Sequence, residues 1–494
     1  MTDVQQAAPV KHYDVAIIGS GFSGLGMAIQ LKKAGRNDFI LLEKADGIGG
    51  TWRDNHYPGA ACDVPSHMYS FSFEQNPNWS RFYSTQPEIL AYMQGCAQKY
   101  DLMPHVQVNS ELVEARWDNQ KQHWKLQLTS GQRLTARVVV SGIGGLSRPA
   151  LPKVKGLEKF KGEVFHSAEW NHDYDLTGKR VAVVGTGASA IQFVPQIAPK
   201  VGKLVLFQRT APWLVPKPDM QMPNWTKATF SKLPASQKVF RSSVYWQAEA
   251  FAIGFINPKL MYGIEKLAKF HIKNQVKDPV LREKLTPNYT IGCKRVLFSN
   301  NYYPALCRDN VDVISAGVKE VTAHQVIDAN GVAHDVDAII CGTGFDVQDP
   351  LGPLKIYDTQ GVEVHERPEM NAYLGTTLKD LPNLFMLLGP NTALGHNSVV
   401  FMIESQIHYV MQCLAEMDKR KAQAIQVKPD AVDRYNQKIQ SELKKTVWSQ
   451  GGCKSWYFND EGVNITLWPS FTWKYWLKMR SPVFSKFEFS KLQA

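Results

Sequence analysis

The 494-residue chain lacks several features that would assign it to a class directly. It contains no run of about 18 apolar residues, so we expect no membrane-spanning helix. Its N-terminal stretch has no apolar segment of the kind that a secretory signal needs. With neither an H-E-x-x-H motif nor paired cysteines, no metal site is predicted, and the lack of a G-x-S-x-G motif gives serine hydrolysis no support.

Cysteine is scarce and scattered. The seven cysteines are an odd number without C-x-x-C spacing, which argues against a disulfide framework and against a dithiol reductase. A reduced, cytoplasmic setting is the simplest interpretation. The cysteines are Cys62, Cys96, Cys293, Cys307, Cys341, Cys413 and Cys453.

The formal net charge is +11, but the basic residues are dispersed and form no recognisable nucleic-acid module. We therefore expect a basic surface that attracts an anionic cofactor such as a dinucleotide phosphate, rather than nucleic acid. The segment 468–480 is aromatic and basic. It could touch a membrane surface, but packing of its aromatic residues in the core is favoured.

Residues 13–43 have the pattern of a βαβ unit, in which an apolar strand runs into a glycine loop, a helix and a second strand. The loop Gly19-Ser-Gly21-Phe-Ser-Gly24 has G-x-G-x-x-G spacing, which lets a pyrophosphate approach a helix N-terminus. Glu43 follows Gly24 by 19 residues, where a carboxylate can accept from ribose hydroxyls. The unit therefore predicts an adenosine cofactor with a free 2′-hydroxyl, such as FAD.

Residues 180–210 repeat the pattern, with the loop Gly185-Thr-Gly187-Ala-Ser-Ala190 between two apolar strands. Here Arg209 stands 19 residues past Ala190, where the first unit has an acid. An arginine at this place can pair with a 2′-phosphate, so NADPH is favoured over NADH.

Two such units predict an α/β fold with two Rossmann-like dinucleotide-binding domains. We expect the first part of an FAD-binding domain at 8–150 and an NADPH-binding domain at 151–374. Amphipathic segments at about 218–290 indicate a helical insertion into the second domain, and residues 375–494 are expected to return to the first.

The stretch between the two loops contains Phe160, Gly162, His166 and Trp170. This spacing resembles the fingerprint F-x-G-x-x-x-H-x-x-x-W-[P/D] of type I Baeyer–Villiger monooxygenases, with Asn171 in place of the last residue. Related flavin-containing monooxygenases have a Phe- or Tyr-type residue where Trp170 stands. The resemblance implies that this segment couples NADPH binding to domain movement, and that His166 is not a direct proton carrier.

Residues 50–63 resemble a second signature of the family, G-x-W-x-x-x-x-[F/Y]-P-G-x-x-x-D. The resemblance implies that Asp63 lies near the flavin and orients Arg295, the essential arginine. It also implies that Lys294 assists in binding the 2′-phosphate. The turn at 342–346 matches the family's G-T-G-F-D segment.

The loop at 389–398 matches a segment that borders the flavin, where Asn391 and Asn397 could bond the isoalloxazine or ribityl groups. The catalytic candidates are Arg295 and Asp63. The predicted cofactor-binding residues are Gly19, Gly21, Gly24, Glu43, Gly50, Thr51, Trp52, Tyr57, Asp63, Gly185, Gly187, Ala190, Arg209, Thr210, Lys294 and Asn391.

The resemblance implies that NADPH reduces FAD and that O2 then forms a C4a-peroxyflavin. This species inserts one oxygen next to a ketone carbonyl to give an ester or lactone, with sulfide oxidation as a further activity. The expected partners are a small-molecule ketone or sulfide and O2, without nucleic acid or integral membrane association. We expect a monomer or a weak homo-oligomer.

Two alternatives stay open. A flavin-containing monooxygenase that oxidises sulfur or nitrogen would use the same cofactors, and one ketone and one amine as test substrates would distinguish it. A non-catalytic flavin- and NADP-binding redox sensor is the alternative from another class. NADPH oxidation measured with and without ketone would separate it from an enzyme.

Overall fold

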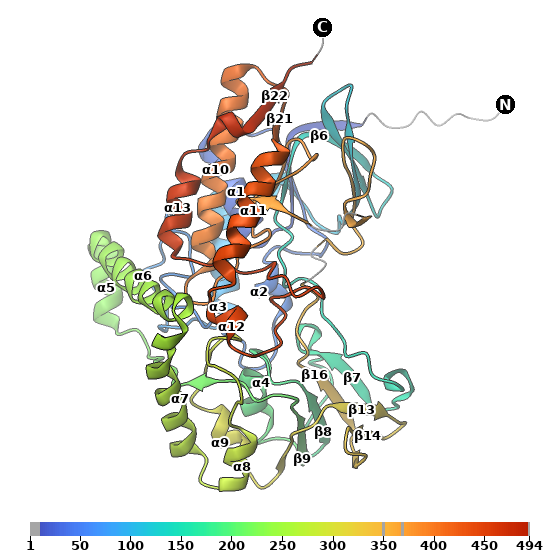
Figure 1. Cartoon of the computed structure of the whole chain (residues 1–494), viewed down its shortest axis with the longest axis vertical. Helices are drawn as coiled ribbons and strands as arrows, with labels where there is room; N and C mark the ends of the chain where they lie inside the picture. Colours follow the sequence, from blue (N-terminus) through green and yellow to red (C-terminus); the bar gives the residue numbers. More distant parts are fainter. Residues whose placement is uncertain (1–9, 348–350, 367–369, 493–494) are drawn as a thin grey trace, which may run out of the picture.

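The computed structural model describes residues 10–347, 351–366 and 370–492, and it has a mixed α/β fold (Figure 1). Two sheets organise the chain. In Figure 1 the larger sheet lies in the upper half, beside long helices from the C-terminal part, and the smaller, fully parallel sheet lies below it. The expected start of the first domain at residue 8 falls outside the described residues.

The larger sheet has the strand order β17-β4-β5-β6-β1-β2-β3, with β20 also paired to β6 and followed by β19 and β18. At its centre β1 pairs in parallel with β2 and β6, so that Val15 lies opposite both Phe39 and Val138. The strands are β1 (Lys11–Ile18), β2 (Phe39–Leu42), β3 (Val106–Gln107), β4 (Leu112–Asp118), β5 (His123–Leu128), β6 (Arg133–Ser141), β17 (Lys355–Tyr357), β18 (Ala372–Tyr373), β19 (Thr377–Leu378) and β20 (Leu384–Met386).

The smaller sheet has the order β12-β9-β8-β16-β7, and every neighbouring pair is parallel. Its central strands are apolar and buried, as expected for a sheet covered on both faces. A separate antiparallel sheet of β13, β14 and β15 is inserted in the chain between β12 and β16. The strands are β7 (Glu163–His166), β8 (Arg180–Val184), β9 (Lys203–Phe207), β12 (Val311–Ile314), β13 (Val318–Val321), β14 (Gln325–Asp328), β15 (Ala333–Asp335) and β16 (Ala338–Cys341).

Helix α1 (Phe22–Lys33) follows the first glycine loop and is buried over most of its length. It packs against α10 (Val399–Arg420), and a Cβ at Gly26 would lie 2.8 Å from Ile407 and 2.9 Å from Phe71. Glycine therefore lets the two helices approach closely. The other helices of this half are α2 (Thr51–Asp54), α3 (Gln86–Lys99), α11 (Pro429–Leu443), α12 (Val447–Gln450) and α13 (Thr472–Arg480).

The expected helical segment at 218–290 lies between the short parallel strands β10 (Leu214–Val215) and β11 (Leu297–Phe298). Its first two helices form the green arm on the left of Figure 1, and the next two lie below it in yellow-green. They are α5 (Asn224–Lys232), α6 (Pro234–Ile256), α7 (Tyr262–Gln275) and α8 (Pro279–Lys284), and the smaller sheet carries α4 (Ala190–Ile197) and α9 (Tyr302–Leu306).

The cysteines were expected to be reduced and to form no disulfide framework, and this expectation is wrong for one pair. Cys293 and Cys453 are bonded, with their Cα atoms 6.1 Å apart, although 160 residues separate them in the sequence. Spacing along the chain gave no sign of this pair because the fold brings its two segments together. The five other cysteines are free.

The C-terminal aromatic segment packs largely as expected. Trp468 and Tyr475 are buried, while Trp476 and Leu477 on the opposite side of α13 are exposed. Strands β21 (Ala424–Val427) and β22 (Phe487–Ser490) pair beside it. In the described part of the chain, no helix is long and apolar enough to cross a membrane.

Candidate active site

A cavity of about 1910 Å³ extends between the two sheets and is lined by both glycine loops. The segment that contains Lys294 and Arg295 forms another part of its wall, together with residues from the C-terminal part of the chain. The predicted residues that line it are Gly19, Gly21, Glu43, Gly50, Thr51, Trp52, Tyr57, Asp63, Gly185, Gly187, Arg209, Thr210, Lys294, Arg295 and Asn391. Gly24 and Ala190 are absent from this lining, as are the four fingerprint residues.

The first loop is held by close backbone approaches. Gly19 has a φ of +92°, and a Cβ there would lie 2.9 Å from the carbonyl oxygen of Gly142, at the end of β6. A Cβ at Gly24 would lie 1.8 Å from the carbonyl oxygen of Gly19, so Gly24 serves the packing of α1. Gly21 caps α1 without a side-chain acceptor, which leaves the helix N-terminus able to bind an anion.

The second loop has the same construction. Gly185 has a φ of +106°, and a Cβ there would lie 2.4 Å from the carbonyl oxygen of Gly342, which follows β16. Gly342 in turn packs against Ala190, whose side chain would be 3.3 Å from a Cβ at that glycine. The last position of each motif is therefore a packing position beneath the cavity.

Glu43 follows β2 and is 3% exposed. One carboxylate oxygen accepts from the backbone N–H and the hydroxyl of Ser20, at 2.9 and 2.5 Å, and the other accepts from Ala45 and pairs with Arg53. Burial raises the pKa of Glu43, but these hydrogen bonds and the charge of Arg53 outweigh it and hold the pKa below its usual range. Glu43 is therefore an anion that fixes the first loop from below.

The second family signature lies against the first loop. Gly50 has a φ of +51°, and a Cβ there would lie 2.9 Å from the Cα of Gly21, so two glycine backbones meet at this point. The short helix α2 then carries Thr51 and Trp52, whose indole N–H donates to Tyr69 at 3.1 Å. The two glycines therefore leave this part of the cavity wall without side chains.

Arg295 and Asp63 form a two-fold hydrogen-bonded ion pair. The guanidinium Nε and Nη2 each lie 2.8 Å from a different carboxylate oxygen. Their side chains keep 34% and 25% of their surface exposed, and both line the cavity. The charge of Asp63 raises the pKa of Arg295, while burial opposes it. Burial raises the pKa of Asp63, but Arg295 holds it below its usual range, so both groups are charged.

Lys294 and Arg209 both line the cavity, and their charges interact. Burial and then the charge of Arg209 lower the pKa of Lys294. Among the described residues neither cation has an acidic partner, and the Lys294 ammonium lies 5.0 Å from the ring centre of Tyr289. Two unpaired cations of this kind, beside the second glycine loop, suit an anion such as a 2′-phosphate.

The fingerprint residues lie behind the cavity wall. A Cβ at Gly162 would be 2.2 Å from the carbonyl oxygen of Asp337, which lets β7 pair with β16. His166 is 1% exposed and accepts from the backbone N–H of Ala168 at 3.1 Å, and burial lowers its pKa. Trp170 packs on Phe193 of α4 with ring centres 5.3 Å apart. The segment therefore contacts the helix that follows the second loop.

Sequence reasoning missed Gln192, which connects the two halves of the site. Its side-chain oxygen accepts from the hydroxyl of Tyr57 at 2.8 Å and from the N–H of Ala61 at 3.3 Å, and its amide donates to the Ala61 carbonyl at 2.9 Å. Gln192 lies on α4, so the FAD-side signature is bonded to the helix of the second loop. A glutamine within a helix carries no sequence signal for such a contact.

The expected loop at 389–398 borders the cavity, but its amide groups are engaged by the protein. Asn391 donates to the carbonyl of Asn464 at 2.8 Å, and Asn397 donates to Glu249 at 2.8 Å. Contacts between these two amides and a flavin stay a prediction. Trp456 and Tyr457, which the sequence did not single out, also line the cavity.

Comparison with known proteins identifies the relatives of this chain. A family described as pyridine nucleotide-disulphide oxidoreductase matches residues 16–254. A Baeyer-Villiger monooxygenase of Pseudomonas aeruginosa is 52% identical over 474 residues, which cover 95% of this chain and 90% of that protein. One from Streptomyces coelicolor is 45% identical over 466 residues, covering 94% and 90%.

Solved structures agree in fold over nearly the whole length. A steroid monooxygenase bound to NADP is 29% identical with a TM-score of 0.86, covering 97% of this chain and 100% of that one. Cyclohexanone monooxygenase from Rhodococcus sp. Phi1 bound to NADP⁺ is 27% identical with a TM-score of 0.88, covering 98% and 100%. The chain has two glycine loops and an arginine–aspartate pair in one cavity, and it shares 52% and 45% of its aligned residues with two Baeyer-Villiger monooxygenases. It therefore belongs to the FAD- and NADPH-dependent Baeyer–Villiger monooxygenases.

Proposed function

We propose that this enzyme converts a small-molecule ketone into an ester or lactone at the expense of NADPH and O2, and that it also oxidises sulfides. The observation that carries the proposal is the Arg295–Asp63 pair, which lies in the same cavity as both glycine loops. A fixed positive charge in this position stabilises negative charge that develops during oxygen transfer. Asp63 holds the guanidinium plane in place through two hydrogen bonds, so Arg295 requires little reorganisation when that charge forms.

The residues of the first loop fit FAD. The N-terminus of α1, next to Gly21, would hold its pyrophosphate, and Glu43 would lie near its ribose. The Gly21–Gly50 contact leaves room for the ring system beside Trp52. When bound, the flavin supplies hydride acceptance and oxygen activation, while the protein supplies binding, orientation and charge.

The residues of the second loop fit NADPH. Gly185 and Gly187 would admit its pyrophosphate, while Arg209 and Lys294 would bind the 2′-phosphate from two sides. Thr210 follows Arg209, and its carbonyl accepts a hydrogen bond from the hydroxyl of Thr186, the second residue of the loop, at 3.2 Å. This bond holds the segment of Arg209 and Thr210 close to the phosphate site.

We also infer the expected domain division. Residues 8–150 and 375–494 would form the FAD-binding domain, and residues 151–374 the NADPH-binding domain with its insertion at about 218–290. The segments 348–350 and 367–369 lie outside the described residues. The separate parallel sheet supports the second domain, and the larger sheet, which includes β20 from the C-terminal part, supports the return to the first. Because β17 and β18 also pair in the larger sheet, we infer that this return begins by residue 355 rather than at residue 375.

Product analysis with the FAD-loaded protein tests the proposal. NADPH consumption would be measured together with products from a panel of cyclic, linear and aryl ketones, one sulfide and one amine. We expect ester or lactone in step with NADPH, and we expect Arg295→Ala to stop product formation while FAD stays bound. Sulfoxide or N-oxide without any ester would assign the enzyme to heteroatom oxidation instead, and undiminished ester from the variant would remove Arg295 from its role.

A further inference from the structure

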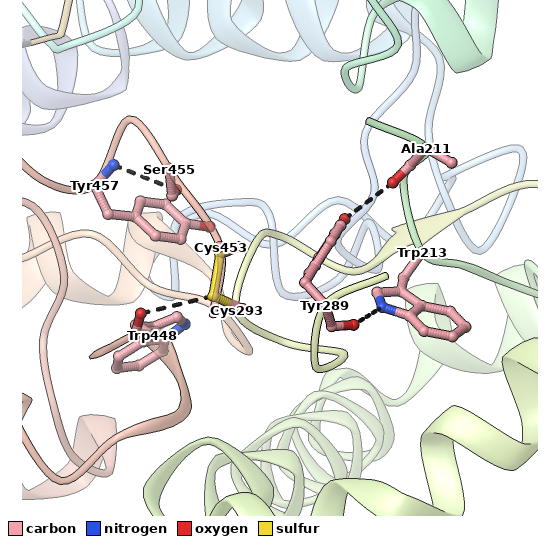
Figure 2. Close-up of a disulfide and its surroundings, with 8 residues drawn as sticks. All are labelled: Ala211, Trp213, Tyr289, Cys293, Trp448, Cys453, Ser455 and Tyr457. Atoms are coloured by element: carbon pink, nitrogen blue, oxygen red, sulfur yellow. Dashed lines mark hydrogen bonds between the residues drawn. A yellow bond between two sulfur atoms is a disulfide. The ribbon is translucent and has the colours of Figure 1, made fainter. Parts of the chain in front are cut away.

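The Cys293–Cys453 disulfide lies beside the proposed reaction centre, and nothing in the proposed function requires it. Cys293 directly precedes Lys294 and Arg295, and Cys453 lies in residues 451–463, here called the wall loop, much of which lines the cavity. Figure 2 shows the bond with Tyr457 and Trp448 on one side and Tyr289 and Trp213 on the other. One covalent bond therefore joins two walls of the same cavity.

The packing around the bond is close and asymmetric. A Cβ at Gly451 would lie 2.5 Å from the Cβ of Cys293, and the backbone N–H of Thr290 donates to the Gly451 carbonyl at 3.1 Å. Cys293 is 0% exposed, whereas Cys453 is only half-buried. A small thiol or a peroxide therefore reaches the pair from the side of Cys453.

Apart from this bond, the first part of the wall loop has few anchors. None of the backbone N–H groups of residues 452–456 donates a hydrogen bond to another residue that the structure describes. Gly452 has a φ of +72°, and Trp456 is 47% exposed. Further along, the hydroxyl of Tyr457 interacts with the Arg295 backbone. A segment with so few hydrogen bonds opens at low energetic cost once its covalent link is cut.

We propose that the Cys293–Cys453 disulfide is a redox-dependent clamp that positions Arg295 and the wall loop and thereby keeps oxygen activation coupled to product. This inference rests on the proposed function. With the clamp closed, Tyr457 stays against the Arg295 backbone and the cavity excludes water. With the clamp open, the wall loop moves away, water enters, and reducing equivalents from NADPH leave as hydrogen peroxide.

Both directions of the switch are chemically balanced. To close it, the Cys453 thiol loses its proton and attacks hydrogen peroxide as the thiolate, which gives a sulfenic acid and hydroxide, and the released proton converts the hydroxide to water. The Cys293 thiol then displaces the second water as the S–S bond forms, so two thiols and one peroxide give one disulfide and two waters. A dithiol opens the clamp by exchange and becomes a disulfide itself. Hydrogen peroxide released by the open enzyme would therefore re-form the disulfide, and the closed enzyme would then release less peroxide.

The state of the bond is measured by alkylating the denatured holoenzyme without reductant. Since five of the seven cysteines are free, five labels are expected for the closed form and seven after dithiothreitol. Hydrogen exchange of the native holoenzyme then reports on the backbone N–H groups of Thr290 and Ile465, which donate to the wall-loop carbonyls of Gly451 and Tyr457 at 3.1 Å each. We expect at least tenfold faster exchange there after dithiothreitol and in the Cys293→Ser/Cys453→Ser double variant. Seven labels in untreated protein, or equal exchange in both forms, would overturn the clamp.

Coupling is measured as product formed per NADPH consumed, with hydrogen peroxide quantified in the same reaction. We expect the reduced enzyme and both single serine variants to release several times more peroxide per NADPH. Treatment with peroxide should restore coupling in the reduced wild-type enzyme but not in the variants. If the bond only stabilised the fold, its loss would lower the melting temperature and leave the product formed per NADPH unchanged. That result would also overturn the clamp.

Cys307→Ser is the matched control, because Cys307 is an exposed free cysteine. Its coupling, exchange rates and response to dithiothreitol should equal those of the wild type. Failure of the proposed function looks different: the closed wild-type enzyme would then form no ester from any ketone. The alkylation and exchange measurements would still decide the clamp in that case, since neither depends on turnover.

Discussion

Removal of the two cations at the proposed 2′-phosphate site should weaken NADPH binding without affecting NADH. A hydrogen bond to a charged group contributes about 1.5–3 kcal/mol, and about 1.4 kcal/mol corresponds to a tenfold change in binding. Arg209 is exposed, so solvent screening places it near the lower limit. Lys294 is partly buried, so it belongs nearer the upper limit. We expect Arg209→Ala to raise the KM for NADPH roughly tenfold and Lys294→Met to raise it on the order of 30–100-fold.

The two residues should also be coupled in their titration. The positive charge of Arg209 contributes to the lowered pKa of Lys294. Lys294 loses its charge as the pH rises through this lowered pKa, and NADPH binding weakens with it. Arg209→Ala removes the repulsion, so the pKa of Lys294 should rise and the alkaline loss of affinity should move to higher pH.

The assay is a set of steady-state measurements of KM for NADPH and NADH between about pH 6 and 10, a range that spans the loss of lysine charge. Lys121→Ala serves as control, because it removes one exposed cation from a turn that does not line the cavity. An equal rise in KM for both cofactors would show that these cations do not recognise the 2′-phosphate. An alkaline limb that stays in place in Arg209→Ala would refute the coupling.

Three further outcomes follow from the geometry. Asp63→Asn should leave FAD bound but lower product per NADPH. Because the pKa of Asp63 is depressed in the folded protein, the stability that it gains from Arg295 should be constant near neutral pH and lost only as the pH falls below the ordinary carboxyl value of 3.8. A stability difference between wild type and variant that disappears near neutral pH would contradict this. Gly24→Ala should yield protein that does not retain FAD, because the new Cβ would lie 1.8 Å from the Gly19 carbonyl, and a normal flavin spectrum would show that α1 adapts. Gly95→Ala is the contrasting substitution, since its new Cβ would enter open space on an exposed face of α3. The midpoint of urea unfolding should rise by the equivalent of about 0.5–1 kcal/mol, and a lower midpoint would contradict this prediction.

Local sequence patterns predicted much of the secondary structure. The βαβ patterns expected at 13–43 and 180–210 are present as β1, α1 and β2 and as β8, α4 and β9. These patterns consist of apolar residues and glycines a few positions apart, so they can be recognised in the sequence without knowledge of any distant contact. Gly24 and Ala190 were predicted to bind cofactor as parts of their motifs, but both lie outside the cavity lining and pack beneath it.

Family resemblance placed Asp63 and Arg295 together, and the structure has that contact, while its catalytic role stays a prediction. The sequence alone established two glycine loops, an acid after one and an arginine after the other, because these signals depend on local backbone geometry and short spacing. Tertiary structure alone decided that Gln192 bonds the two halves of the site and that Cys293 meets Cys453. Such contacts join segments more than 100 residues apart, and they form only when burial of the apolar core brings those segments to one cavity.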